Sequence, residues 1–182
     1  MTDEAQSAVL SRPLKLDDLK DGTSGETEAT PAEIETIAGL LGLVALDGLA
    51  FSYRLDHRGG GRWHLTGRLE AKVVQTCVVS LDPVAVNLDV PVEVEFWPRA
   101  LVDDLTRQDA EESGTQGLLD WPEAVVDGRI DLGPVIYESL ATALDPYPKR
   151  EGVSFDWSQG AAEEAGQAET GPFAALAALK RR

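Results

Sequence analysis

Hydrophobic and polar residues alternate along positions 84–96. Valine, leucine and phenylalanine occupy the even positions, and mostly polar residues occupy the odd ones. This period of two predicts a strand with one buried side. Pro91 has no backbone N–H, so we expect the strand to lie at a sheet edge or to bend there. Another strand precedes it from Val73, and Asp82 and Pro83 predict a tight turn between the two at residues 80–83.

A hairpin is predicted immediately upstream. Leu49, Phe51, Tyr53 and Leu55 alternate with polar residues, and a glycine-rich loop follows at residues 57–61. Alternation in the return strand separates apolar from basic side chains, which gives an antiparallel meander whose outer side is basic. Its apolar face carries Trp63, Leu65, Leu69, Ala71 and Val73, and its other face carries Arg62, His64, Thr66, Arg68, Glu70 and Lys72.

Two helices are predicted from local start and stop signals. The first spans residues 31–41, because Thr30 can cap it, Glu33 is placed for a capping box and Gly42 stands just past its end. The second follows Asp131, its predicted N-cap, and stops at an Asp-Pro pair. Their apolar stripes are Ile34, Ile37, Ala38 and Leu41 in the first helix, and Leu132, Val135, Ile136, Leu140, Ala143 and Leu144 in the second.

These elements predict one α+β domain over residues 12–148. We expect either an antiparallel β-meander or a partly closed, barrel-like sheet, packed with two helices. Residues 99–122 are acidic and predict a mobile loop within this domain. Residues 1–11 are predicted to be a disordered N-terminus and residues 149–170 a disordered linker. Short strands are compatible with residues 12–19 and 25–29, the second as a return strand.

The last residues, 171–182, differ from the linker before them. Phe173, Leu176 and Leu179 fall on one side of a possible helix, and three basic residues follow. The segment is too short to be stable alone, so it is either a frayed tail or a tethered peptide that docks on a partner.

The formal net charge of −16 over 182 residues is the most informative total. A protein of this charge repels nucleic acid on average and favours basic partners. A single cysteine excludes an internal disulfide framework and suits a reducing compartment. No apolar run reaches about 18 residues and the N-terminus has no secretory pattern, so we expect a cytoplasmic protein without a membrane span.

Candidate chemistry is sparse. Cys77 lies where a strand meets a turn, and it is either a reactive thiol or a small buried residue. His57 and His64 flank the glycine loop, but two histidines fall short of the three or four ligands of a usual metal site. No catalytic or phosphate-loop motif is present, so we expect no enzyme activity, no metal, no cofactor and no small-molecule substrate.

The basic outer side of the hairpin is the remaining candidate. It is either a solvated face that balances an acidic protein or a strip that binds the phosphates of RNA. Tyr53 and Trp63 are the neighbouring aromatics, and their alternation predicts that both are buried. The candidate RNA-contacting residues are Arg54, Arg58, Arg62, Arg68 and Lys72.

Three stretches together resemble the YceD family, and most closely its alphaproteobacterial branch. They are V-x-Q-T-C-V-V-S-L-D-P-V from Val73, G-R-I-D-L-G from Gly128 with its helix to L-D-P-Y-P, and the ending P-F-A-A-L-A-A-L-K. Many members carry C-x-x-C at the turn, whereas here Ser80 takes the second place after Cys77. A role for a thiolate pair, in metal binding or redox chemistry, therefore does not apply.

The resemblance implies a non-catalytic factor for large ribosomal subunit assembly and 23S rRNA accumulation. The family's gene commonly neighbours that of a small basic large-subunit ribosomal protein. We therefore expect the acidic body to hold a basic ribosomal protein, the basic hairpin face to meet precursor rRNA, or both. An acidic protein-binding adaptor unrelated to ribosomes is the alternative, and an unrecognised enzyme that uses Cys77 is a third.

Overall fold

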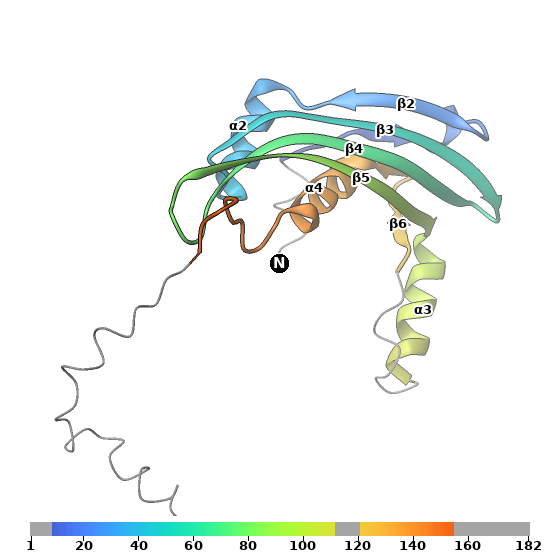
Figure 1. The fold of residues 1–182 in the computed structure, drawn as a ribbon. Helices are drawn as coiled ribbons and strands as arrows, with labels where there is room; N and C mark the ends of the chain where they lie inside the picture. The colour runs from blue at the N-terminus through green and yellow to red at the C-terminus, as the bar shows by residue number, and fades with distance from the viewer. Residues whose placement is uncertain (1–8, 112–120, 155–182) are drawn as a thin grey trace, which may run out of the picture. The chain divides into compact units, whose positions relative to one another are not determined.

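The structure is a computed structural model that describes residues 9–111 and 121–154. Its first compact unit ends at Arg150 and carries the fold. Five strands form an open sheet in the order β2-β3-β4-β5-β6 (Figure 1). β2 to β5 pair antiparallel, and β6 pairs parallel with the end of β5. The strands are β2 (Thr23–Glu28), β3 (Ala45–Gly59), β4 (Arg62–Thr76), β5 (Pro83–Pro98) and β6 (Glu123–Val125).

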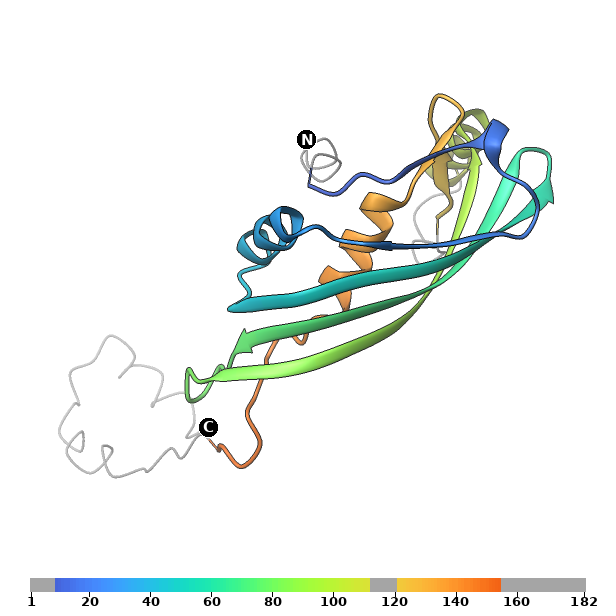
Figure 2. The same ribbon diagram turned by 90° about the horizontal axis from the view of Figure 1, so that it is seen from above.

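The predicted α+β class is confirmed, and of the two expected sheets the meander is the one present. A small second sheet pairs β1 (Pro13–Lys15) with β7 (Arg129–Asp131), and a 3-10 helix η1 (Leu16–Asp18) follows β1. Figures 1 and 2 show helix α4 crossing the concave side of the main sheet, with α2 beside one end of it. The α-helices of the described chain are α2 (Pro31–Leu40), α3 (Arg99–Glu111) and α4 (Leu132–Ala143).

Both predicted helices form where their caps place them. The Thr30 side chain accepts the Glu33 backbone N–H, and the Glu33 carboxylate accepts the Thr30 backbone N–H, which completes the capping box. Asp131 caps α4 by accepting the Gly133 backbone N–H at 2.9 Å. Gly42 has φ +64°, the left-handed conformation that ends a helix at low cost when the residue is glycine.

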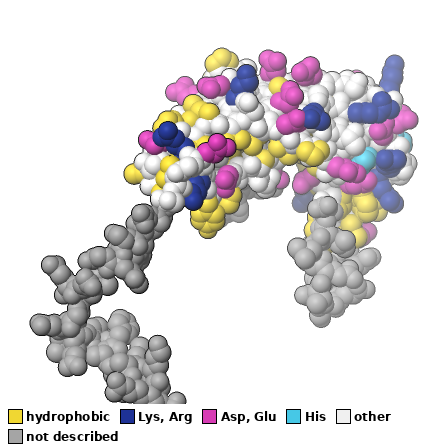
Figure 3. All heavy atoms as spheres, viewed as in Figure 1, with side chains coloured by type: hydrophobic (Ala, Val, Ile, Leu, Met, Phe, Trp, Pro, Cys, Tyr) yellow, Lys and Arg dark blue, Asp and Glu magenta, His cyan; other side chains and the backbone are white. Residues whose placement is uncertain are grey.

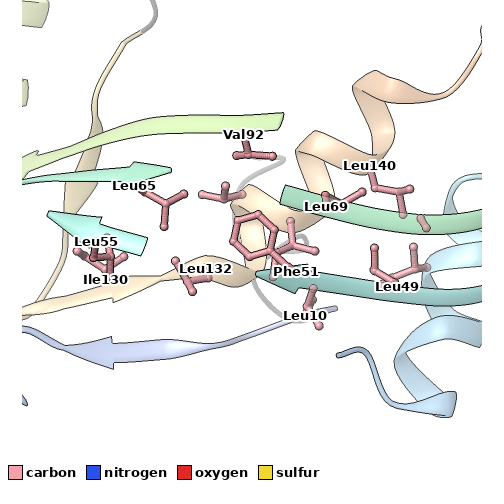
Figure 4. Close-up of a cluster of buried hydrophobic side chains, with 14 of the residues drawn as sticks. Leu10, Leu49, Phe51, Leu55, Leu65, Leu69, Val92, Ile130, Leu132 and Leu140 are labelled. Carbon is pink, nitrogen blue, oxygen red and sulfur yellow. The ribbon is translucent and has the colours of Figure 1, made fainter. Parts of the chain in front are cut away.

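One apolar core lies between α4 and the inner side of the sheet (Figure 4). Phe51, Leu69 and Leu140 are fully buried there, and each leucine contributes roughly 1.5–3 kcal/mol by leaving water. Gly67 on β4 lies against the Phe51 ring. A side chain does not fit there, because an added Cβ would lie 2.5 Å from the ring. The predicted buried stripes of β3, β4 and α4 therefore meet in one cluster.

The connections between the long strands differ in length from the predictions. β3 continues to Gly59, so only Gly60 and Gly61, both with positive φ, turn the hairpin that was expected to have a five-residue loop. The β4–β5 connection is longer than the predicted turn and spans residues 77–82. Two backbone hydrogen bonds hold this connection: the Cys77 N–H donates to the Asp82 carbonyl, and the Cys77 carbonyl accepts the N–H of Leu81.

The described parts of two segments that were predicted to be irregular are structured. Residues 99–111 form α3 instead of a loop, with ion pairs from Arg99 to Asp103 and from Arg107 to Asp104 along the helix. At the N-terminus, predicted to be disordered, Leu10 is buried in the core. Residues 1–8, 112–120 and 155–182 lie outside the described part of the chain, so predictions for them stay predictions.

The two short N-terminal strands do not pair as expected. The second was predicted to return along the first, but β2 pairs with β3 and β1 pairs with β7. Pro91 lies where β5 forms the edge of the sheet, because β6 pairs only with residues 96–98 of β5. In the described residues, no helix combines the length and apolar character needed to cross a membrane.

Candidate functional site on the outer face of the sheet

The outer face of the main sheet carries the candidate basic residues, as the alternation in β4 predicts. The register of the strands also brings acidic residues from β2, β3 and β5 onto this face, and they outnumber the basic ones. Figure 3 shows side chains of both charges along the sheet. The expected positive surface is therefore wrong as a description of the whole face. Its acids are Glu26, Glu28, Asp47, Asp56, Glu70, Asp89, Glu93 and Glu95, and its cations are Arg54, Arg58, Arg62, Arg68 and Lys72.

Two of the five candidate cations are paired with carboxylates. Arg54 contacts Asp56 at 2.9 Å, and Arg68 pairs with Asp89 on the neighbouring strand. In both cases the side-chain hydrogen bond to the carboxylate raises the pKa of the arginine above its ordinary value. These arginines are partly neutralised where they stand, which reduces their attraction for a phosphate.

Arg58 at the hairpin tip has a different partner. Its Nη2 lies 3.0 Å from Nδ1 of His64, whose Nε2 lies 2.8 Å from Oε1 of Glu93. Because a guanidinium can only donate, Nδ1 accepts and Nε2 carries the hydrogen donated to Glu93. A neutral imidazole therefore satisfies both contacts. His64 is only 9 % exposed, although its alternation predicted an outward, solvated position.

Arg62 lies over an aromatic ring beside this network. Its guanidinium carbon is 4.7 Å from the centre of the Trp97 ring, and the Trp97 indole donates to Glu95 at 2.9 Å. Among the described residues, neither Arg62 nor Arg58 forms an ion pair with a carboxylate. Figure 3 shows Lys and Arg side chains gathered at this end of the sheet, where the two glycines turn the hairpin.

The aromatic residue of this face escaped the sequence prediction. Trp63 is 6 % exposed, as its alternation predicts. Tyr53 was also expected to be buried but is half-buried, and both residues belong to the core side. Trp97 instead stands on the outer side, because it falls on the odd positions of β5. That alternation was visible in the sequence, but the pairing of β4 with β5 was needed to bring Trp97 beside Arg62.

At the other end of the same face, small residues open a hollow of about 650 Å³. Strand register aligns Glu28, Ala50, Glu70 and Asp89 in one row across four strands. Ala50 and the neighbouring Gly48 leave space between the carboxylates, with Asp47, Asn87 and Lys72 also lining the hollow. Lys72, the fifth candidate, therefore stands among acids.

Cys77 is a fully buried residue of the β4–β5 turn. Its Sγ accepts the backbone N–H groups of Val79, Ser80 and Arg150, each at 3.4 Å. Hydrogen bonding from the side chain and backbone of Ser80, followed by the backbone of Arg150, lowers the thiol pKa to about 6 against the opposing effect of burial. Arg150 also pairs with Asp82 at 2.8 Å. This ion pair and the hydrogen bond from the Arg150 backbone to the Cys77 thiol together join the turn to the segment after α4.

Two other predictions concern sites away from the sheet face. Within the described ranges, no group of three or more His, Cys, Asp or Glu side chains is arranged to hold a metal ion. Phe173, Leu176 and Leu179 lie outside the described residues, so their role in docking a partner stays a prediction.

The fold and this surface define an acidic α+β protein built on an open antiparallel sheet with one charged, solvent-facing side. A family model, described as the large ribosomal RNA subunit accumulation protein YceD, matches residues 65–180. The match covers more than half of the chain, so the chain belongs to the YceD family. Neither the curated proteins nor the solved structures that were searched contain a match.

Proposed function

We propose that the protein is a cytoplasmic, non-catalytic factor for assembly of the large ribosomal subunit and that it supports 23S rRNA accumulation. Membership of the YceD family carries this proposal, because the family's description is large ribosomal RNA subunit accumulation. A binding role agrees with a fold that exposes a broad charged face. We infer that the protein acts by holding precursor rRNA, a basic ribosomal protein, or both.

For RNA, the geometry favours the tip of the β3–β4 hairpin. Arg58 and Arg62 are the arginines of the outer face that have no carboxylate partner among the described residues, and the glycine turn projects them from the end of the sheet. A phosphate would gain charge-assisted hydrogen bonds from both guanidinium groups. Trp97 lies under Arg62, so a nucleobase that displaces the guanidinium could stack on the indole.

A pair of matched double variants tests the RNA contact. Arg58→Gln with Arg62→Gln removes the two tip charges, and Arg54→Gln with Arg68→Gln removes two charges that are already paired with acids. We expect the tip variant to lose co-sedimentation with precursor large subunits, and the control to keep it within about threefold. Two lost contacts should also reduce the salt slope of single-stranded RNA binding by about 1.4.

Two results would remove the RNA contact from the proposal. The first is wild-type co-sedimentation of the tip variant. The second is an equal loss in both variants, because this would indicate general electrostatics instead of a local site. The ratio of 23S to 16S rRNA in cells that carry only the variant gives an independent measure of the proposed function.

An acidic adaptor outside ribosome assembly is the second candidate, and the net charge of −16 favours it. Crosslinking the tagged protein in cells separates the two functions. An assembly factor should co-purify with large-subunit proteins and precursor rRNA, whereas the adaptor should co-purify with basic proteins and no ribosomal components.

A further inference from the structure

The outer face of strands β2 to β5 is a sheet face without a partner in the described chain. Figure 1 shows helix α4 on the opposite, concave side and helix α2 at one end of the sheet, where its Ile34 borders the hollow described above. The core residues of the strands point to that side, and the charged residues point away from it. A face of this kind either stays solvated or receives another molecule.

The acidic hollow gives this face a shape as well as a charge. Glu28 and Glu70 stand two strands apart, about 10 Å at the usual strand spacing, and Ala50 lies between them. The methyl group of Ala50 and the backbone of Gly48 line a space of about 650 Å³. This space admits the stem of a long side chain whose charged end reaches both carboxylates.

The carboxylates around the hollow are available for such a contact. Asp89 already pairs with Arg68, but Glu28, Asp47 and Glu70 form no ion pair with another described residue. Lys72 offsets only part of their charge. Along β2, Glu26 and Glu28 point outward two residues apart, which is about 7 Å in a strand.

We propose that this hollow, together with Glu26 and Glu28, docks an extended lysine- and arginine-rich segment of a basic protein. One cationic side chain enters over Ala50 and contacts Glu28 and Glu70. A second cation two residues along the segment has the same spacing of about 7 Å and meets Glu26. The segment lies on the face and needs no rearrangement of the sheet.

The charge of the surface favours a basic peptide over RNA as the occupant. Carboxylates in a row repel phosphates, and an extended basic segment brings several cations at the required spacing. The inference deepens the proposed function and rests on it for the nature of the client, a basic ribosomal protein. The binding itself depends only on the surface and is measured without ribosomes.

Fluorescence anisotropy with a labelled twelve-residue peptide of alternating lysine and alanine tests the docking site. The full-length protein is used, with a peptide of alternating glutamate and alanine as the negative probe. Glu28→Gln with Glu70→Gln removes the two central charges. Ala50→Leu fills the hollow without changing any charge. Asp17→Asn with Glu138→Gln is the matched control, because it removes two exposed acids that lie off this face.

We expect the Gln pair and Ala50→Leu each to weaken binding of the lysine peptide at least tenfold, and the control pair to weaken it less than threefold. An equal loss in the control pair, or wild-type binding by the Gln pair, would overturn the proposed site. Circular dichroism checks that Ala50→Leu folds. If Ala50→Leu does not fold, the double variant Glu28→Gln with Glu70→Gln alone decides the result. If Glu28→Gln with Glu70→Gln loses the peptide but still binds precursor subunits, while Arg58→Gln with Arg62→Gln shows the reverse, the docking site and the RNA contact are separate.

Discussion

Arg12 connects the N-terminal segment to helix α2 through two parallel hydrogen bonds with Glu33. Nη1 and Nη2 lie 2.8 Å from Oε1 and Oε2 respectively, and Nε donates to Thr27 at 2.8 Å. Glutamine at position 33 keeps the size of the side chain and its place in the capping box. Glu33→Gln therefore removes the charge of the pair and one of its two hydrogen bonds, because the amide nitrogen that replaces Oε1 cannot accept from Nη1 of Arg12.

The expected magnitude follows from the titration of Glu33. The hydrogen bond from Arg12 is the largest cause that lowers its pKa, from 4.5 to about 2, and burial opposes the change. At about 1.36 kcal/mol per pKa unit, the difference corresponds to roughly 3 kcal/mol. The side chains of Arg12 and Glu33 are 24 % and 21 % exposed, so water screens part of this interaction. We expect Glu33→Gln to lower the free energy of unfolding by about 1.5–2 kcal/mol at pH 7.

The contribution of Glu33 should also depend on pH in a defined window. Its pKa is lower in the folded than in the unfolded chain, so its stabilisation is complete above the unfolded value of 4.5 and is lost as the pH falls through about 2. The difference in unfolding free energy between wild type and Glu33→Gln should therefore decrease between pH 5 and pH 2. Urea unfolding followed by circular dichroism measures it.

A double-mutant cycle with Arg12→Gln isolates the pair from the other contacts of each residue. We expect a coupling energy of about 1.5 kcal/mol. Glu35→Gln on the exposed side of α2 is the matched control, and it should change stability by less than about 0.5 kcal/mol at pH 7. A coupling energy below about 0.5 kcal/mol, typical of an exposed pair, would refute the reasoning, as would a Glu33→Gln deficit that persists unchanged at pH 2.

Three further predictions concern the backbone and the buried thiol, and urea unfolding tests each. Gly133→Ala should cost more than about 3 kcal/mol, because its Cβ would lie 1.9 Å from the Leu10 carbonyl oxygen. Gly39→Ala, with no atom within 4 Å, should instead add about 0.5–1 kcal/mol, and equal effects of the two changes would contradict this account. The pKa of Cys77 is lowered from 9.0 to about 6. The free energy of unfolding that Cys77 adds relative to Cys77→Ala should therefore be complete above pH 9 and decrease as the pH falls through 6. A difference that does not change with pH would be inconsistent with a stabilised thiolate. Leu81→Gly should add about 0.5–1 kcal/mol, since Leu81 has φ +62° and is 75 % exposed, and a loss would show that its side chain packs.

The elements predicted most closely are those whose signals lie within one short segment. Helix α2 is an example, because Thr30, Glu33 and Gly42 specify its start and its end without help from the rest of the chain. Strands β3 and β4 are another, because a period of two over many residues assigns each side chain to a face. Burial then follows from the alternation, as it does for Trp63.

The elements that were missed depend on pairing between distant segments. β6 and β7 have three residues each, too few for a period, although Asp127 and Gly128 between them supply the positive φ values of a hairpin turn. An Asp-Gly pair between apolar residues was therefore the signal that could have found them. β1 was expected to pair with β2, and it pairs with β7 more than 110 residues away.

The candidate site shows the same limit more strongly. Alternation in β4 correctly gathered its basic residues on one side, but the acids that face them come from other strands. Glu28, Glu70 and Asp89 meet in one row only because of the register of four strands. The sequence supplied the charges, and the pairing of strands decided which charges neutralise one another.

The two arginines without a carboxylate partner among the described residues and the carboxylates of the hollow consequently lie at opposite ends of the outer face. Arg62 at the tip and Glu70 at the hollow lie eight residues apart on β4, which is about 26 Å at 3.3 Å per residue. This separation exceeds the screening length of about 8 Å at physiological salt. Each surface therefore acts through its own local charges, and neutralising one should leave binding at the other unchanged. If both proposed contacts form, the molecule would hold a basic protein segment and an RNA phosphate at the same time, despite a net charge of −16 that repels RNA on average.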